Sequence, residues 1–109
     1  WAGHPDTLPW LRDRAATDES WAVRRAAVQA IAAGWADHPD TLPWLRDCAT
    51  TDDYWAVRQA AVQAIAAGWA DDPDTFSWLR ERATADDDND VRRAAVQAIA
   101  RTVAEGMTS

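Results

Sequence analysis

The chain has 109 residues, of which 48% are hydrophobic and 27% charged, a composition typical of one folded domain that excludes disorder and argues against two catalytic domains. It contains 18 Asp and Glu against 11 Arg and no Lys, and its net charge of −7 argues against a surface that binds nucleic-acid phosphates. The 25 Ala residues far outnumber the 5 Leu, 3 Ile and 7 Val. Because alanine is the strongest helix former and β-branched residues are few, we predict an all-α fold.

A repeat of 34 residues organises the chain. Residues 1–34 and 35–68 are identical at 28 of 34 positions, and residues 69–102 match the second copy at 22 positions. Three copies with this period predict a stacked array in which each unit buries its apolar face against its neighbours. We therefore predict repeats at 1–34, 35–68 and 69–109 that together form one domain.

Each copy divides into two predicted helices. In the first copy, Asp6 provides an N-cap carboxylate, and Pro9 suits the first turn of a short helix that ends near Ala15 or Ala16. Turn-forming polar residues then separate it from a second helix over 21–33. We expect this helix to stop at Gly34 in the left-handed conformation that glycine often adopts at helix ends.

The second helix of each copy is amphipathic. At about 100° per residue, the predicted core stripe of copy one consists of Val23, Ala27, Ala30 and Ile31. A flank beside this stripe and an outer row opposite it remain for a partner. The flank holds Trp21, Val28 and Ala32, and the outer row holds Ala22, Arg25, Gln29 and Ala33.

The third copy differs from the second mainly near its end. Polar residues replace Trp55, Ala56, Ala67 and Gly68, the substitutes being Asn89, Asp90, Arg101 and Thr102. This pattern indicates a C-terminal cap that faces water. Because residue 102 is not a glycine, we predict a longer last helix that continues to about Glu105.

The first copy has no such polar protection. It retains Leu8 and Trp10, so we expect an open apolar face of a few hundred Å². The chain starts at Trp1 and not at Met, and we expect it to be an excerpt of a longer array. The open face then packs against preceding repeats or forms a homo-oligomer.

The segments 17–31 and 86–99 carry an Asp, a Val-Arg step and an Ala-Ala step, and they resemble HEAT repeats, particularly the short HEAT-like repeats of bacteria. Pro9 and Pro43 match the early proline of that family. The resemblance implies an α-solenoid of three stacked helix pairs, although full HEAT units are about 40 to 47 residues long and 34 is the tetratricopeptide length. It also implies a ladder between adjacent units, formed by Asp18, Asp52 and Asp86 with Arg24, Arg58 and Arg92.

Units with Trp near Asp-Pro and with Leu-Pro-Trp-Leu are similar to those in the C-terminal arrays of bacterial NACHT-type signalling ATPases, which implies a sensor or scaffold. We therefore predict a non-catalytic module for protein binding or self-assembly, located in the cytoplasm. The alternative is a HEAT-like nucleic-acid module of the DNA glycosylase type, which the charge of −7 disfavours. A third class, the phycobilin lyases, shares only the repeat. No apolar stretch reaches the roughly 18 residues of a membrane span.

The tryptophans and the outer positions give the candidate interaction residues. Trp35 and Trp69, at the junctions between copies, are predicted to plug the space between repeats. Trp21 and Trp55 fit either a ligand anchor or a seal between repeats, and the loss of Trp at position 89 favours the seal. The candidate surface consists of Trp21, Arg25, Val28, Gln29, Trp55, Gln59, Val62, Gln63, Arg93 and Gln97. The three copies have charges of 0, −3 and −4, which indicates a basic or neutral partner for the C-terminal half or serves solubility alone.

The sequence predicts no catalytic site, no cofactor and no metal site. His4, His38 and Asp72 share one repeat position, but equivalent positions in stacked helices lie roughly 8 to 10 Å apart, too far for one ion. The acidic run 86–90 lacks the glycine and glutamate of a calcium loop and indicates an acidic helix start. Cys48 replaces the Arg of copies one and three at a position expected to face solvent, with no histidine nearby in sequence to activate it.

Overall fold

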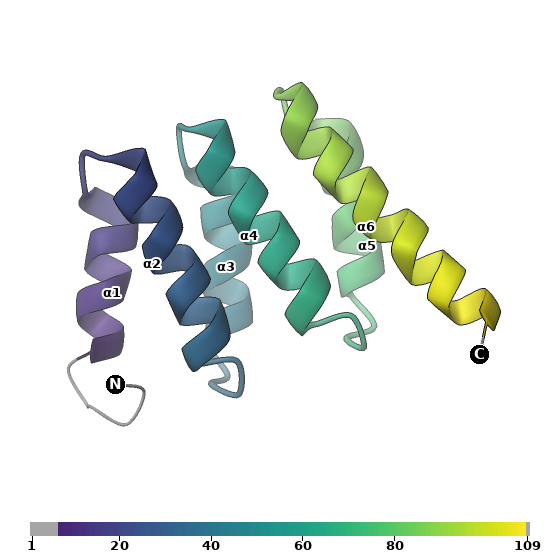
Figure 1. Cartoon of the computed structure of the whole chain (residues 1–109), viewed down its shortest axis with the longest axis horizontal. Coiled ribbons are helices and arrows are strands. Elements are labelled where there is room, and N and C mark those ends of the chain that lie inside the picture. The colour runs from purple at the N-terminus through teal and green to yellow at the C-terminus, as the bar shows by residue number, and fades with distance from the viewer. Residues whose placement is uncertain (1–6, 109) are drawn as a thin grey trace.

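The computed structural model describes residues 7–108, the last three through their backbone only. This part of the chain contains six helices and no strand (Figure 1). The helices are α1 (Thr7–Thr17), α2 (Trp21–Gly34), α3 (Thr41–Thr51), α4 (Trp55–Gly68), α5 (Thr75–Ala85) and α6 (Asn89–Thr108). The prediction of an all-α array of three helix pairs is therefore confirmed.

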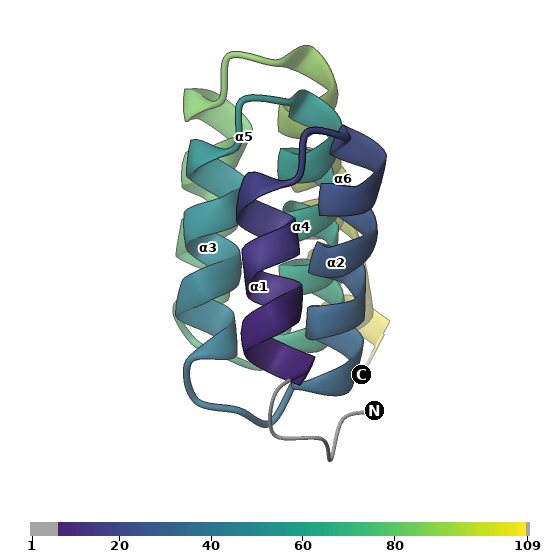
Figure 2. The same ribbon diagram turned by 90° about the vertical axis from the view of Figure 1, so that its left-hand side faces the viewer.

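The helix pairs form two layers. The short helices α1, α3 and α5 make one layer, and the longer helices α2, α4 and α6 make the other (Figure 2). Each short helix packs against the long helix that follows it, and α4 packs against both α2 and α6. Contacts between neighbouring short helices are few or absent in the described residues. The long helices therefore hold the three repeats together.

The helix ends differ from the prediction at Gly34. This glycine is the last residue of α2, and no described glycine has a positive φ. The chain leaves the helix instead at Trp35, which has a φ of −128° and whose amide donates to the carbonyl of Ile31 at 3.0 Å. Gly68 and Trp69 repeat this arrangement. The predicted left-handed glycine cap is wrong, because the chain turns at the tryptophan, where ψ is 34° at Trp35 and 32° at Trp69, while φ of the glycine is not positive.

The starts of α3 and α5 use a different cap from the one predicted for the first copy. Asp6 lies outside the described residues, and the equivalent Asp40 and Asp74 make no side-chain cap. The amide of Asp40 instead donates to Nδ1 of His38 at 3.2 Å, and the amide of Asp74 donates to Oδ1 of Asp72 at 2.9 Å. The residue two positions earlier therefore holds the turn before the helix.

The core runs between the two layers and contains mostly aliphatic side chains. Its largest fully buried members include Ile31, Leu45, Val57, Ile65, Leu79 and Val91. In α2, Ala27 and Ile31 are buried as predicted, whereas Val23 and Ala30 are exposed and Val28 is fully buried. The predicted stripe is wrong at these positions because the following repeat covers Val28, whereas no described repeat covers Val23 and Ala30 from the preceding side.

The last helix is longer than its counterparts, as predicted. α6 has 20 residues, whereas α2 and α4 have 14 each, and it continues through Thr102 without a break. The predicted end at about Glu105 is wrong, because the helix continues through Gly106 to Thr108. The hydroxyl of Thr102 donates to the carbonyl of Ala98 at 2.9 Å, so this residue stays within the helical pattern. The polar residues of copy three still leave Val96 and Val103 exposed at the C-terminal end of the array.

Candidate interaction surfaces

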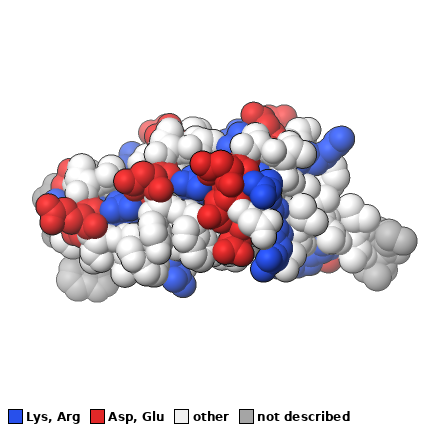
Figure 3. Space-filling model, turned by 90° about the horizontal axis from the view of Figure 1, so that it is seen from above, with Lys and Arg blue, Asp and Glu red and all other residues white. Residues whose placement is uncertain are grey.

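Ion pairs between repeats follow the loops at one edge of the array. Nε and Nη2 of Arg58 on α4 donate to the two carboxylate oxygens of Asp86, at 3.0 and 3.2 Å. Nη2 also reaches Asp87 at 3.1 Å, and Nη1 donates to the carbonyl of Asp52 at 2.7 Å. One arginine therefore connects its own repeat to the next one. Figure 3, which looks down on these loops, shows acidic and basic side chains next to one another along the array.

Arg24 makes the same contacts one repeat earlier. Its Nε and Nη2 donate to Asp52 at 3.1 and 3.2 Å, and its Nη1 donates to the carbonyl of Asp18 at 2.8 Å. Oδ1 of Asp52 also accepts the amide of Tyr54 at 2.9 Å, which fixes the loop that presents the carboxylate. Asp86 accepts the amide of Asp88 in the same way. The ladder has two rungs in the described residues, Arg24–Asp52 and Arg58–Asp86.

The environment keeps these arginines charged. The hydrogen bond to Asp52 is the largest influence that raises the pKa of Arg24. Burial acts to lower the pKa of Arg58, but the bond to Asp86 and the charges of Asp86, Asp87 and Asp88 together raise it. Both guanidinium groups are occupied by protein carboxylates, which favours a structural role for them over a phosphate site.

The ends of the ladder have different partners. Nη1 of Arg92 donates to the carbonyl of Asp86 at 2.7 Å, as Arg24 and Arg58 do with their own loops. No carboxylate of the described residues lies within ion-pair distance of Arg92. At the other end, Asp18 accepts the amide of Ser20 at 2.9 Å, and its second oxygen lies 3.6 Å from Arg14 of the same helix pair.

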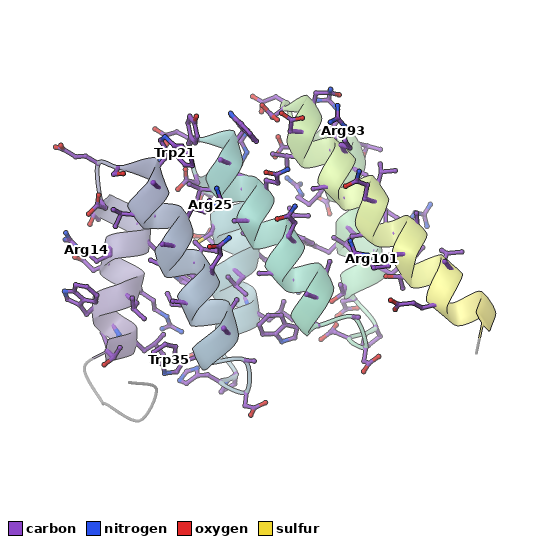
Figure 4. All side chains as sticks on the ribbon, viewed as in Figure 1. Arg14, Trp21, Arg25, Trp35, Arg93 and Arg101 are labelled. Atoms are coloured by element: carbon purple, nitrogen blue, oxygen red, sulfur yellow. The ribbon has the colours of Figure 1, made fainter. Side chains whose placement is uncertain are left out.

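One of the predicted tryptophans contacts the neighbouring repeat. The ring of Trp21, which is labelled in Figure 4, stacks on Tyr54 of the next repeat, with the ring centres 4.9 Å apart. Trp55 is partly buried, and its ring centre lies 5.9 Å from that of Tyr54. Trp35 and Trp69 are partly buried and pack against the core. Sequence reasoning missed Tyr54, because Ser20 and Asp88 replace it in the other copies, and only its aromatic character beside Trp55 was a signal.

The outer row of the long helices is largely exposed. Arg25, Gln29, Gln63, Arg93 and Gln97 are exposed, and Gln59 is partly buried. Val28 and Val62 are fully buried and must be removed from the candidate surface, because they face the following repeat and not solvent. Arg101, which the candidate set did not include, extends the row along α6 (Figure 4).

A shallow groove of about 400 Å³ lies within the outer row, between α2 and α4. Its floor consists of alanines and Gly68, and Gln29 and Gln63 line it from the two helices. Small floor residues leave the backbone of an approaching chain close to the helices, and the two amides provide donors and acceptors. The groove therefore combines a lining of small residues with two hydrogen-bonding side chains.

Cys48 is partly buried and packs against the core, so the expectation that it faces solvent is wrong. It lines a groove of about 650 Å³ near the C-terminal ends of α1 and α3, and Asp47 and Asp52 line the same groove. Burial is the main cause that raises the pKa of the Cys48 thiol to about 12, and the charges of Asp47 and Asp52 add to it. The thiol is therefore protonated at neutral pH, the opposite of an activated nucleophile.

The candidate metal residues have structural contacts instead. His4 lies outside the described residues, and His38 and Asp72 hold the turns before α3 and α5. The described side chains include no group of three His, Cys, Asp or Glu placed to hold a metal ion. Oδ1 of Asp88 accepts the amides of Asp90 and Val91 at 2.8 and 3.3 Å, which is the acidic start that the sequence predicted for the last helix.

The array matches one known family over most of its length. A family model for HEAT repeats matches residues 8–100. The chain belongs to the HEAT-repeat family. HEAT arrays are generally scaffolds for protein interactions and are typically not enzymes. Comparisons with curated proteins and with solved structures return no match. None of the helices in the described part of this HEAT array is both long and apolar enough to cross a bilayer.

Proposed function

We propose that this HEAT array binds an extended segment of another protein along the outer row of α2, α4 and α6. One observation carries the proposal. Gln29, Gln63 and Gln97 occupy the same repeat position on three adjacent helices, and all three are exposed. Gln29 and Gln63 line a groove whose floor is mostly alanine. Arg24, Arg58 and Arg92 also repeat in every described long helix, but they are buried or partly buried, so among such positions only the glutamines are exposed.

The spacing of the glutamines suits a polypeptide backbone. Packed helices lie roughly 8 to 10 Å apart, and an extended chain advances about 3.3 Å per residue, so consecutive glutamines meet about every third residue of the segment. A primary amide donates and accepts hydrogen bonds, as a peptide group does. Such contacts provide affinity for the backbone without dictating its side chains.

The charges along the row give a preference for the side chains of the segment. Arg25 and Arg93 are exposed, as is Arg101, and Arg93 lies 3.5 Å from Asp90. Asp86, the most deeply buried acid of copy three, stands in the loop before α6 and not in this row, and Arg58 already neutralises its charge. We therefore propose a partner segment that contains acidic residues, in place of the basic or neutral partner expected from the charges of whole copies.

The test uses three peptides of equal length, extended and identical except for Glu, Ser or Lys at alternate positions. Each is titrated into the isotope-labelled chain, and amide signals are followed by nuclear magnetic resonance. The Glu peptide should move signals of α2, α4 and α6 most strongly. Arg25→Ala should weaken its binding several-fold. Arg80→Ala, which removes an equal charge from an exposed position on α5, should leave binding unchanged.

Two results would contradict this function. Shifts confined to α1, α3 and α5 would place the site on the other layer, and equal weakening by Arg25→Ala and Arg80→Ala would reduce the effect to net charge. A single-stranded DNA oligonucleotide at low salt serves as a further probe. Binding of the DNA at the same residues, in the absence of peptide binding, would support the nucleic-acid alternative.

We further propose that the array belongs to the sensing region of a NACHT-type signalling ATPase, as the Leu-Pro-Trp-Leu segments at 8–11 and 42–45 imply by resemblance. The gene that encodes the chain provides the test. A phosphate-binding loop of a nucleotide-binding domain, encoded upstream of Trp1 in the same reading frame, would support this context. An upstream region without such a loop would contradict it.

A further inference from the structure

The exposed large apolar side chains of the array occur only in its first and last copies among the described residues. Copy one exposes Trp10, Trp21 and Val23, and copy three exposes Phe76, Val96 and Val103. Copy two has the same kinds of residue at these positions, and all of them are buried or partly buried. Exposure therefore depends on whether a neighbouring repeat is stacked on that side.

Two sets of equivalent valines show which side each end presents. Val57 and Val91, which have a preceding repeat, are fully buried, whereas Val23 of the first copy, which has none described, is 41% exposed. Val28 and Val62, which have a following repeat, are fully buried, whereas Val96 of the last copy is 53% exposed. The two ends of the chain are thus the two halves of one interface, which occurs twice inside the molecule.

The ladder has complementary charges at the same two ends. Arg92 makes the bond to its own loop carbonyl that Arg24 and Arg58 make, so its guanidinium is already held at the position from which they reach the next repeat. No described carboxylate pairs with it there. At the opposite end, Asp18 has the same loop bond as Asp52 and Asp86 but no arginine from a preceding repeat.

We propose that a second copy of this chain stacks head to tail on the first, with α6 of one copy against α1 and α2 of the next. Arg92 then pairs with Asp18 and Glu19, the counterparts of Asp86 and Asp87 at the existing rung. Val96 enters the interior, as Val28 and Val62 do. Because the two contacting surfaces differ, the association is open-ended, and further copies can add at either end of the assembly.

The charges of the repeats favour this arrangement over contact between equal ends. Copy one has no net charge, and copy three, with the residues that follow it, has a charge of −4. A contact between two C-terminal ends joins two acidic surfaces, and a contact between two N-terminal ends leaves Arg92 without a carboxylate. Head-to-tail stacking avoids both.

The new junction is weaker than the junctions inside the chain. Asn89 stands where Trp21 and Trp55 stand in the first two copies, and Val103 replaces the tryptophan at the position of Trp35 and Trp69. The junction between copies therefore lacks the aromatic stack that Trp21 makes with Tyr54. We expect reversible association that depends on protein concentration.

Sedimentation velocity of the 109-residue chain, from about 1 µM to about 1 mM, tests the proposal. The average mass should rise with concentration and pass twice the mass of one chain. Asp18→Arg places two arginines at the junction, Arg92→Asp places acids on both sides, and each should weaken association at least about tenfold. Asp13→Arg makes the same charge change as Asp18→Arg at an exposed position outside the ladder and should leave association unchanged.

A mixture of the two ladder variants provides the decisive measurement. An Asp18→Arg chain keeps its C-terminal end intact, an Arg92→Asp chain keeps its N-terminal end intact, and the two altered ends have exchanged charges. An equimolar mixture should therefore associate under conditions in which neither variant associates alone. A monomer at every concentration would overturn the proposal, as would a mixture that stays monomeric or a dimer that Arg92→Asp does not affect. If circular dichroism shows that Arg92→Asp is unfolded, Val96→Asp, at an exposed position on the same face, takes its place.

Discussion

Replacing Arg58 by methionine should be among the most destabilising single changes in this molecule. Methionine keeps an unbranched side chain that can fill the space of the arginine stem, but it removes the guanidinium that bonds Asp86, Asp87 and the carbonyl of Asp52. The carboxylate of Asp86, whose side chain is only 3% exposed, then keeps one bond, from the amide of Asp88. A buried charge without its partner is the main cost.

The expected loss is about 3 to 5 kcal/mol, the range for removing one partner of a buried ion pair. A domain of this size has a total stability of roughly 5 to 15 kcal/mol, so the variant should be measurable but much weakened. Urea unfolding followed by circular dichroism gives the free energy of unfolding. The midpoint should fall without a large change in the slope of the transition.

Arg92→Met is the matched control for this change. Arg92 occupies the same repeat position and makes the same bond to its own loop, but no described carboxylate of a following repeat pairs with it. Its replacement should cost about 1 kcal/mol, the value of an ordinary hydrogen bond. The measurement is made at low protein concentration, where the chain is monomeric.

A second variant separates the buried charge from the lost packing. Asp86→Asn keeps an oxygen that can accept the amide of Asp88 while removing the charge. Added to Arg58→Met, it should restore about 2 kcal/mol of the loss, which a double-mutant cycle reports as coupling between the residues. Equal costs for Arg58→Met and Arg92→Met, or no recovery with Asp86→Asn, would refute the view that the ladder holds the repeats together.

Five further substitutions, in three groups, test other parts of the structure. Gly34→Ala and Gly68→Ala should each raise the free energy of unfolding by about 0.5 kcal/mol, because an added Cβ meets nothing within 4 Å and φ is not positive at either residue. A lower free energy of unfolding in chemical denaturation would support the left-handed glycine cap instead. Cys48→Ser should flatten the pH dependence of stability between pH 9 and 12. In this range the unfolded thiol loses its proton and the folded thiol keeps it, so the wild type loses up to about 1.4 kcal/mol of stability per pH unit relative to the variant. Parallel stability curves for the two proteins would contradict the raised pKa of Cys48. Tyr54→Ser, which introduces the residue that copy one has at this position, should lower stability by about 1 kcal/mol in thermal melts. Trp55→Ala should lower it by about 3 kcal/mol, because the variant also loses contact with the core. An equal cost for both would argue against a contribution from the stack of Trp21 on Tyr54.

The repeat carried most of what could be predicted about the fold. Near-identity at a spacing of 34 residues gave the number of helix pairs and their order, and Trp21 was correctly expected at the start of a helix. Gly34 was predicted wrongly because glycine at a helix end has two uses, and the left-handed one is needed only if the next residue cannot turn the chain. Trp35 turns it with a φ of −128° and a ψ of 34°, a conformation that local sequence does not reveal.

The candidate surface was predicted only in part, for a reason specific to stacked repeats. A helical wheel assumes one buried side, so Val28 was assigned to the flank and Val23 to the core. In the array, the side toward the next repeat is covered as well, which buries Val28, while Val23 faces the side that has no described neighbour. The comparison with Val57, which has both neighbours, shows that position in the stack decides burial as much as periodicity does.

Stacking on both sides also explains why the two ends of the array are complementary to each other. A repeat that stacks on both sides must carry both halves of one interface, so nearly identical copies leave complementary halves at the two ends. The sequence can prevent stacking between molecules only by altering an end, and copy three has done so incompletely. It has lost the aromatic residues at 89 and 103, yet it keeps Val96 and Arg92. Restoring Trp at position 89 should therefore strengthen association, and Asn89→Trp provides the reverse of the ladder variants. If this variant has the same sedimentation profile as the wild type, the end of copy three is not a stacking surface.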